Sequence, residues 1–203
     1  MAYIIGQKIG MTHRFDDKGR ITPITVILAE PNTIIQVKSN ESDGYKAVTC
    51  AAGNKKTKNI TKPVAGQLKS GNIDSASIIR EFVNFNNESK VGDKIAVDQF
   101  KPGDMLQITG ITKGKGYSGV IKRHGFHRGP ETHGSDHHRA PGSIGGGYPQ
   151  RVVKGKKMAG HMGSEKTTLS NIQVIDVLNN DNLLLVKGSV PGAKKSWLII
   201  ETI

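Results

Sequence analysis

Short apolar runs separated by turn residues dominate the first hundred residues of the chain and its last forty. Turn signals such as Asp16-Asp17-Lys18-Gly19 and Pro102-Gly103-Asp104 lie between the runs. Eight runs are rich in Val, Ile, Leu and Thr: Tyr3–Ile5, Ile21–Ala29, Thr33–Val37, Tyr45–Ala51, Met105–Ile111, Ile172–Leu178, Leu183–Val186 and Trp197–Ile200. Strands of this length and spacing predict a mainly β fold, either a small closed β-barrel or a sandwich.

Residues 55–90 have a different pattern. The stretch Pro63–Leu68 predicts a short helix with proline at its first position. Ser75–Phe85 fits a helix by the spacing of its apolar residues and a strand by its β-branched residues. We therefore expect a small α/β insert on the β-domain.

Residues 113–163 have a third pattern, rich in charge and glycine. They contain ten of the 29 Lys and Arg residues but two of the 17 acids, so they carry +8 of the net charge of +12 and the rest of the chain carries +4. Thirteen of the 25 glycines and six of the seven histidines also lie here. The branched aliphatic residues in this segment are few: Val120, Ile121, Ile144, Val152 and Val153.

So few apolar side chains cannot offset an ordering cost of about 1–2 kcal/mol per residue. We therefore expect residues 1–112 and 164–203 to form the β-domain, and residues 113–163 to form a long extended loop. The loop would leave a strand near Ile111, return near Thr167, and become ordered only against a partner that neutralises it.

The charge of the whole chain indicates the kind of partner. With a pI of about 9.8 and a mean hydropathy of −0.38, the chain is expected to bind a polyanion. A membrane surface explains the charge poorly, because the longest apolar runs, such as Ile24–Ala29, are far shorter than the roughly 20 residues that span a bilayer. No secretory signal is expected. The lone Cys50 fits a buried thiol in a reducing cytoplasm.

The residue types of segment 113–163 suit RNA. Lysine and arginine supply donors for phosphate oxygens, and glycine lets the backbone approach a nucleic acid closely. Tyr117, Phe126 and Tyr148 are candidates for stacking on unpaired bases. A merely solubilising loop explains the segment less well, since such loops usually mix charge signs.

The run Gly114-Lys115-Gly116-Tyr117-Ser118-Gly119 matches the glycine pattern of dinucleotide-binding sites. Such a site also needs a helix and a second parallel strand. Another glycine, Gly125, follows six residues later, and no second parallel strand is predicted. A dinucleotide cofactor is not expected.

Metal binding and hydrolysis are also weak alternatives. The histidines lack cysteine partners, and cations surround them: His124, His127, His133, His137 and His138. Ser135, Asp136 and His137 are neighbours in sequence, but nothing predicts the fixed geometry that a nucleophile requires. We expect no catalytic residue, metal, cofactor or small-molecule substrate.

Six stretches of the chain carry specific motifs: Gly6–Thr12, Lys113–Phe126, His133–Ser135, His138–Gly145, Gly155–Gly163 and Leu184–Gly192. In these stretches the chain resembles one known family, the universal large-subunit ribosomal protein L-three in its bacterial form. The similarity extends over nearly the whole chain.

This resemblance implies a closed β-barrel of the translation-factor type with a small insert and a long finger. It implies a structural, non-enzymatic constituent of the large subunit in the cytoplasm. The family binds 23S rRNA near its 3′ end, nucleates subunit assembly and extends the finger toward the peptidyl-transferase centre. The implied protein neighbours are L-fourteen and L-nineteen.

Composition and resemblance together give the expected rRNA contacts. They are Lys113, Lys115, Tyr117, Lys122, Arg123, His124, Phe126, Arg128, His138, Arg139, Arg151, Lys154, Lys156, Lys157 and His161. The finger tip is expected at Gly145, Gly146, Gly147 and Tyr148. Some family members carry a methylated glutamine at the tip, but Gln150 follows Pro149 in a different context, so the modification is not expected here.

Two other classes of function remain as alternatives. An enzyme that modifies rRNA or tRNA would need a cofactor site in the β-domain, where no candidate motif occurs. A DNA-architectural protein would explain the basic charge but not the length and glycine content of the segment.

Overall fold

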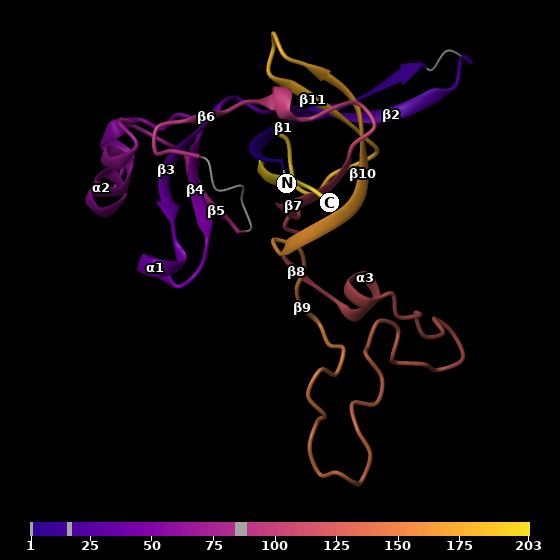
Figure 1. Cartoon of the computed structure of the whole chain (residues 1–203). Coiled ribbons are helices and arrows are strands. Elements are labelled where there is room, and N and C mark those ends of the chain that lie inside the picture. Colours follow the sequence, from indigo (N-terminus) through magenta and orange to yellow (C-terminus); the bar gives the residue numbers. More distant parts are fainter. Residues whose placement is uncertain (1, 16–17, 84–88) are drawn as a thin grey trace. The chain divides into compact units, whose positions relative to one another are not determined.

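A computed structural model describes residues 2–15, 18–83 and 89–203 (Figure 1). The chain divides into two compact units. The first, called here the barrel unit, comprises Met1–Ile111 and Lys166–Ile203, and the second, the loop unit, comprises Thr112–Glu165. The predicted turn at Asp16-Asp17 and the end of the predicted element at Phe85 lie outside the described residues.

Six antiparallel strands close into a barrel in the order β1-β12-β7-β10-β11-β2. The closed ring confirms the mainly β prediction and decides between the barrel and the sandwich. The strands are β1 (Tyr3–Phe15), β2 (Ile21–Leu28), β7 (Met105–Ile111), β10 (Lys166–Leu178), β11 (Leu183–Lys187) and β12 (Trp197–Thr202).

Strands β1 and β10 are much longer than predicted, since the apolar pattern marked only Tyr3–Ile5 and Ile172–Leu178. Each of the two strands pairs with one neighbour along its first part and with another along its second part. Strand β1 pairs with β12 and then with β2, with a register shift between Lys8 and Gly10. Strand β10 pairs with β7 and then with β11, and its register shifts twice. Such bulges place polar and glycine residues inside a strand, which is why the apolar pattern missed most of β1 and nearly half of β10.

Two of the eight predicted strands do not belong to the barrel. They are β3 (Asn32–Lys38) and β4 (Ala47–Ala52), and they form a separate sheet of order β5-β4-β3-β6. Its other strands are β5 (Ile78–Val83) and β6 (Lys94–Ile95). The ambiguous stretch from Ser75 is therefore a strand where it is described. We call this sheet and its helices the insert.

The helices of the barrel unit are short. The helix expected after Pro63 is present as α2 (Lys62–Ser70). The others are α1 (Asn40–Asp43) and the 3-10 turns η1 (Thr57–Asn59) and η2 (Val97–Gln99).

Side chains along β1 point alternately into the barrel and toward the insert sheet, so this strand contributes to the apolar clusters on both sides. Ile4 packs inside the barrel, whereas its neighbours Tyr3 and Ile5 point the other way, against residues of the insert sheet. The Tyr3 ring lies 4.2 Å from the Phe82 ring, centroid to centroid. Cys50 is buried in the same cluster, and this burial raises the pKa of its thiol to about 12. The thiol therefore behaves as a small apolar side chain, as predicted.

Helix α2 covers part of the insert sheet. Leu68 is fully buried and packs with Ile35 and Ala51. The Ser70 hydroxyl donates a hydrogen bond of 2.8 Å to the Ile35 carbonyl oxygen. The described residues of the barrel unit thus form three apolar clusters: one inside the barrel, one between barrel and insert sheet, and one beneath α2.

Candidate nucleic-acid interface

The loop unit begins and ends as a pair of antiparallel arms. The Thr112 amide donates to the Glu165 carbonyl at 3.0 Å, and the Lys115 amide donates to the Met162 carbonyl at 2.8 Å. Beyond these bonds, β8 (Tyr117–Ser118) pairs with β9 (Gly160–His161). Backbone hydrogen bonds, rather than a large apolar core, hold the two arms together.

Gly163 allows the arms to approach each other closely. Its φ is +76°, and a Cβ built on it would lie 2.1 Å from the Lys113 carbonyl oxygen. No side chain fits in that space, so the glycine is required by the geometry of the arms.

A short helix, α3 (Val120–His124), follows β8 and ends at Gly125, whose φ is +70°. The Gly125 amide donates to the Ile121 carbonyl at 2.9 Å and closes the last turn. The sequence did not predict this helix, because five residues between two glycines give no recognisable period.

Helix α3 directly follows the glycine motif Gly114–Gly119, at the position where a dinucleotide-binding site has its helix. However, β8 pairs antiparallel with β9, so the βαβ unit of a dinucleotide site is not formed.

Two side chains of α3 bind the returning arm. Arg123 Nη1 donates to the Met158 carbonyl oxygen at 2.8 Å, and His124 Nε2 lies 3.0 Å from the same oxygen. The Arg123 guanidinium also occupies the space beside Gly160, where a Cβ would lie 2.6 Å from Nη1. These two residues therefore join the two arms within the chain itself.

The part of the loop unit farthest from β8 and β9 in sequence makes few internal contacts. The Gly129 amide donates to the His138 carbonyl at 3.0 Å, and His138 Nδ1 lies 2.8 Å from the Pro130 carbonyl oxygen. Every residue from 139 to 157 is exposed. In this stretch the Ser143 hydroxyl donates to the Gly145 carbonyl at 2.9 Å, which fixes a local turn only.

The family model described as Ribosomal protein L3 matches residues 54–183, which include the whole loop unit. A "Large ribosomal subunit protein uL3" of Oceanobacillus iheyensis is 48% identical over 200 residues, which cover 98% of this chain and 96% of the relative. The protein of the same name from Streptococcus mutans is 47% identical over 199 residues, covering 98% and 95%. The chain belongs to the ribosomal protein L3 family. The resemblance inferred from the motifs is confirmed.

In this L3-family chain, most of the predicted contact residues are exposed on the loop unit. The exposed ones are Lys113, Lys115, Tyr117, Lys122, Arg128, His138, Arg139, Arg151, Lys154, Lys156, Lys157 and His161. Arg123, His124 and Phe126 are half-buried. Tyr117 and Tyr148 are 80% and 93% exposed, so both rings are available for stacking. The tip residues Gly145–Tyr148 are all exposed.

The cations of the loop unit have little intramolecular compensation. Within Thr112–Glu165, all of which is described, Arg128 forms an ion pair, with Glu131, and no other salt bridge occurs. The exposed Arg151, Lys154, Lys156 and Lys157 lie within seven residues. Like charges at this spacing repel one another unless an external anion lies between them.

Two alternatives raised by the sequence, a metal site and a membrane, can also be compared with the described residues. Among them, no group of three or more His, Cys, Asp or Glu side chains is placed to hold a metal ion. No helix of the described chain is both long enough and apolar enough to cross a membrane.

The sequence pattern missed the residues that shape the arms. Gly163, Met158 and Met162 act through their backbone, and only the glycine-rich stretch around them was a signal. Arg123 and His124 were expected to contact RNA, and the structure gives both of them an intramolecular partner as well.

Proposed function

We propose that this chain is a structural constituent of the bacterial large ribosomal subunit that binds 23S rRNA through the loop unit. The observation that carries the proposal is the loop unit itself. It is an exposed segment with nine cations outside any ion pair, and it buries only Ser118 and Val120. Relatives that match this chain over nearly their whole length bear the name of a large-subunit protein.

The barrel unit serves as the scaffold in this proposal. The arms bring Lys113 and Lys115 of the outgoing chain near the returning strand, and the Arg123 contact with Met158 sets their spacing. Phosphates lying along the arms would neutralise the repulsion that the protein leaves uncompensated. The chemistry required is recognition and charge neutralisation, without a catalytic group.

The finer parts of the proposal come from the family. The chain binds near the 3′ end of 23S rRNA, nucleates subunit assembly in the cytoplasm and extends its tip toward the peptidyl-transferase centre. Its protein neighbours are L-fourteen and L-nineteen. A photo-crosslinker at Tyr148, which is 93% exposed, should join the tip to rRNA of that centre in assembled subunits. Crosslinks confined to distant rRNA would contradict this placement.

The salt dependence of rRNA binding tests the central proposal. If five loop-unit cations contact phosphates, the slope of log K against log salt is about −4, at 0.7 to 0.9 per contact. Replacing Lys154, Lys156 and Lys157 with glutamine should make the slope less steep by about 2 to 3. The matched control is Lys90, Lys94 and Lys101 to glutamine, which removes the same charge from exposed barrel-unit positions. A wild-type slope near zero would contradict rRNA binding.

Deletion of Gly142–Arg151 separates the arms from the tip. This stretch is exposed, and its hydrogen bonds, such as those from Ser143 to Gly145 and from Arg151 to Pro149, are local, so its loss should leave the arm hydrogen bonds intact. We expect the shortened protein to join large subunits and to resist removal until high salt. Failure to join them would assign the binding to the tip.

A further inference from the structure

The positive charge of the chain is concentrated in two segments, and the proposed function uses only one of them. Residues 113–163 carry +8 and residues 55–69 carry +5, so the remaining 137 residues have a net charge of −1. No Asp or Glu occurs between Asp43 and Asp74. The second segment therefore has no acidic neighbour in sequence.

This second segment is a folded part of the insert. It comprises the turn η1 and helix α2, and its five lysines are all exposed: Lys55, Lys56, Lys58, Lys62 and Lys69. The salt bridges of the described chain involve none of them. We call this surface the α2 face.

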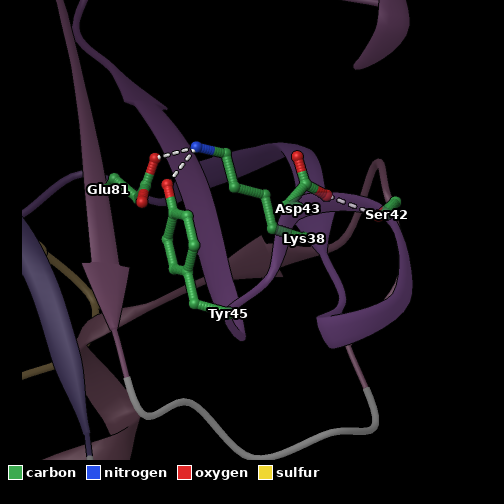
Figure 2. Close-up of polar contacts among 5 residues, drawn as sticks. All are labelled: Lys38, Ser42, Asp43, Tyr45 and Glu81. Carbon is green, nitrogen blue, oxygen red and sulfur yellow. Dashed lines mark hydrogen bonds and ion pairs between the residues drawn. The ribbon is translucent and has the colours of Figure 1, made fainter.

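Lys38, elsewhere in the insert, is a lysine whose positive charge is neutralised within the chain. Lys38 Nζ donates to Glu81 Oε2 at 2.5 Å and to the Tyr45 hydroxyl at 2.6 Å, as Figure 2 shows. The hydrogen bond that Lys38 donates to Glu81 is the largest cause that raises the pKa of the Lys38 amine above its usual range. The insert thus pairs this lysine internally, whereas the lysines of the α2 face form no ion pair with any described carboxylate.

The α2 helix is fixed on its inner side and open on its outer side. Leu68 is fully buried, and Ile60 and Val64 pack against the same cluster. Gly71, just after the helix, packs so closely on β3 that a Cβ would lie 2.8 Å from Ile35 Cγ2. The packing fixes which side of the helix faces solvent.

The open side presents Lys62, Gly66 and Lys69 at helical spacings of four and three residues. These spacings place the three on one stripe of the helix, with the two lysine Cα atoms about 10 Å apart along the axis at 1.5 Å per residue. Gly66 has nothing within 4 Å of the place where a Cβ would be. Glycine is a poor helix former, and its bare backbone between two lysines leaves room for a close approach.

We propose that the α2 face is a second RNA-binding site, specific for the phosphate backbone of double-helical RNA; this inference rests on the proposed function. A solvated surface is the simpler explanation, but such surfaces usually mix charge signs. No aromatic residue or histidine occurs between Tyr45 and Phe82, so the α2 face lacks the rings on which single-stranded bases stack. Double-helical RNA is recognised instead through its backbone and shape.

Lysine footprinting on the full chain tests the site directly. Exposed amines are acetylated in the free protein and in its complex with 23S rRNA, and each lysine is quantified by mass spectrometry. Lys62 and Lys69 should be protected severalfold in the complex, whereas the exposed Lys90 and Lys101 should react equally in both.

Three variants at the α2 face give an independent measurement. Lys62→Gln with Lys69→Gln should make the salt slope of rRNA binding less steep by about 1 to 2. Gly66→Ala should raise the Tm, because alanine favours the helix, and yet weaken binding. Gly66→Glu should weaken binding further. The variant with Lys90, Lys94 and Lys101 changed to glutamine is the control, and circular dichroism checks that each variant folds.

The outcomes separate this site from the loop unit. If the wild-type chain binds rRNA but Lys62 and Lys69 stay reactive and the double variant keeps the wild-type slope, the α2 face is not a site and the loop-unit proposal stands. If the chain does not bind rRNA, both proposals fail. If a single-stranded oligonucleotide protects Lys62 and Lys69 as well as an RNA duplex does, the assignment to double-helical RNA is wrong.

Discussion

The barrel unit and the loop unit are held together by different forces. Inside the barrel, Leu106, Ile108, Leu198 and Ile200 are fully buried and form one apolar cluster. The loop unit buries only Ser118 and Val120, and its arms are joined by backbone hydrogen bonds and by the Arg123 contact with Met158. The first unit buries enough apolar area to offset the entropy cost of its own ordering, whereas the second buries little and, in the proposed function, is ordered by its RNA partner.

The difference explains where charge can accumulate. A barrel of alternating strands needs an apolar residue at every second position, which limits how many cations it can carry. A segment without a core has no such limit, because none of its positions must be apolar for packing, and glycine and lysine can therefore be frequent in it. The two cationic segments differ in the same way, since the α2 face rests on an apolar cluster and the arms do not.

A cavity inside the barrel should give the largest change in stability. Leu198→Ala removes a fully buried side chain, and we expect a loss of about 2–5 kcal/mol in the free energy of unfolding, measured with urea. The control Met105→Ala, at a residue that is 48% exposed, should stay within about 0.5 kcal/mol of wild type. A loss below 1 kcal/mol for Leu198→Ala would show that the barrel is not held by its apolar core.

A side chain at Gly163 should affect the loop unit and leave the barrel unit unchanged. In Gly163→Ala the Cβ meets the Lys113 carbonyl at a φ of +76°, and we expect a local cost of about 1–3 kcal/mol. Hydrogen exchange should show lost protection of the Lys115 and Met162 amides, which bridge the arms. Gly142→Ala is the control, because its φ is +78° but nothing lies within 4 Å of the new Cβ. Equal exchange in the two variants would contradict the role of close packing between the arms.

The smallest effect is expected at the ion pair of the insert (Figure 2). The hydrogen bond from Lys38 lowers the pKa of Glu81 below its ordinary value of 4.5, so the pair stabilises the fold above that pH and loses its contribution as pH falls through the lowered pKa. The raised pKa of Lys38 means that the contribution persists below about 10.5 and is lost only in more alkaline solution.

Glu81→Gln should lower the Tm at pH 7 only slightly, by on the order of one degree, because both side chains are partly exposed. The difference from wild type should vanish in strongly acidic solution. A difference that persists unchanged at pH 2 would assign the effect to packing and not to charge.

The sequence by itself determined the features that depend on local pattern. It located β7 at Met105–Ile111 with both ends correct, because apolar residues and the flanking turn at Pro102–Asp104 are signals within one short window. It also identified the composition of residues 113–163 and, through their motifs, the family to which the chain belongs.

Only the tertiary structure decided which strands share a sheet and which cations have partners. A strand such as β3 has the same apolar pattern whether it joins the barrel or the insert, because its hydrogen bonds go to residues distant in sequence. Arg123 is a residue of the type that contacts RNA, and nothing in the sequence indicated that it donates a hydrogen bond to Met158, which is 35 residues away in the chain. In the same way, Lys38 has a carboxylate partner, whereas Lys62 has none among the residues that the structure describes. The partner of Lys38 follows from the pairing of strands and not from the neighbours of this lysine in the chain.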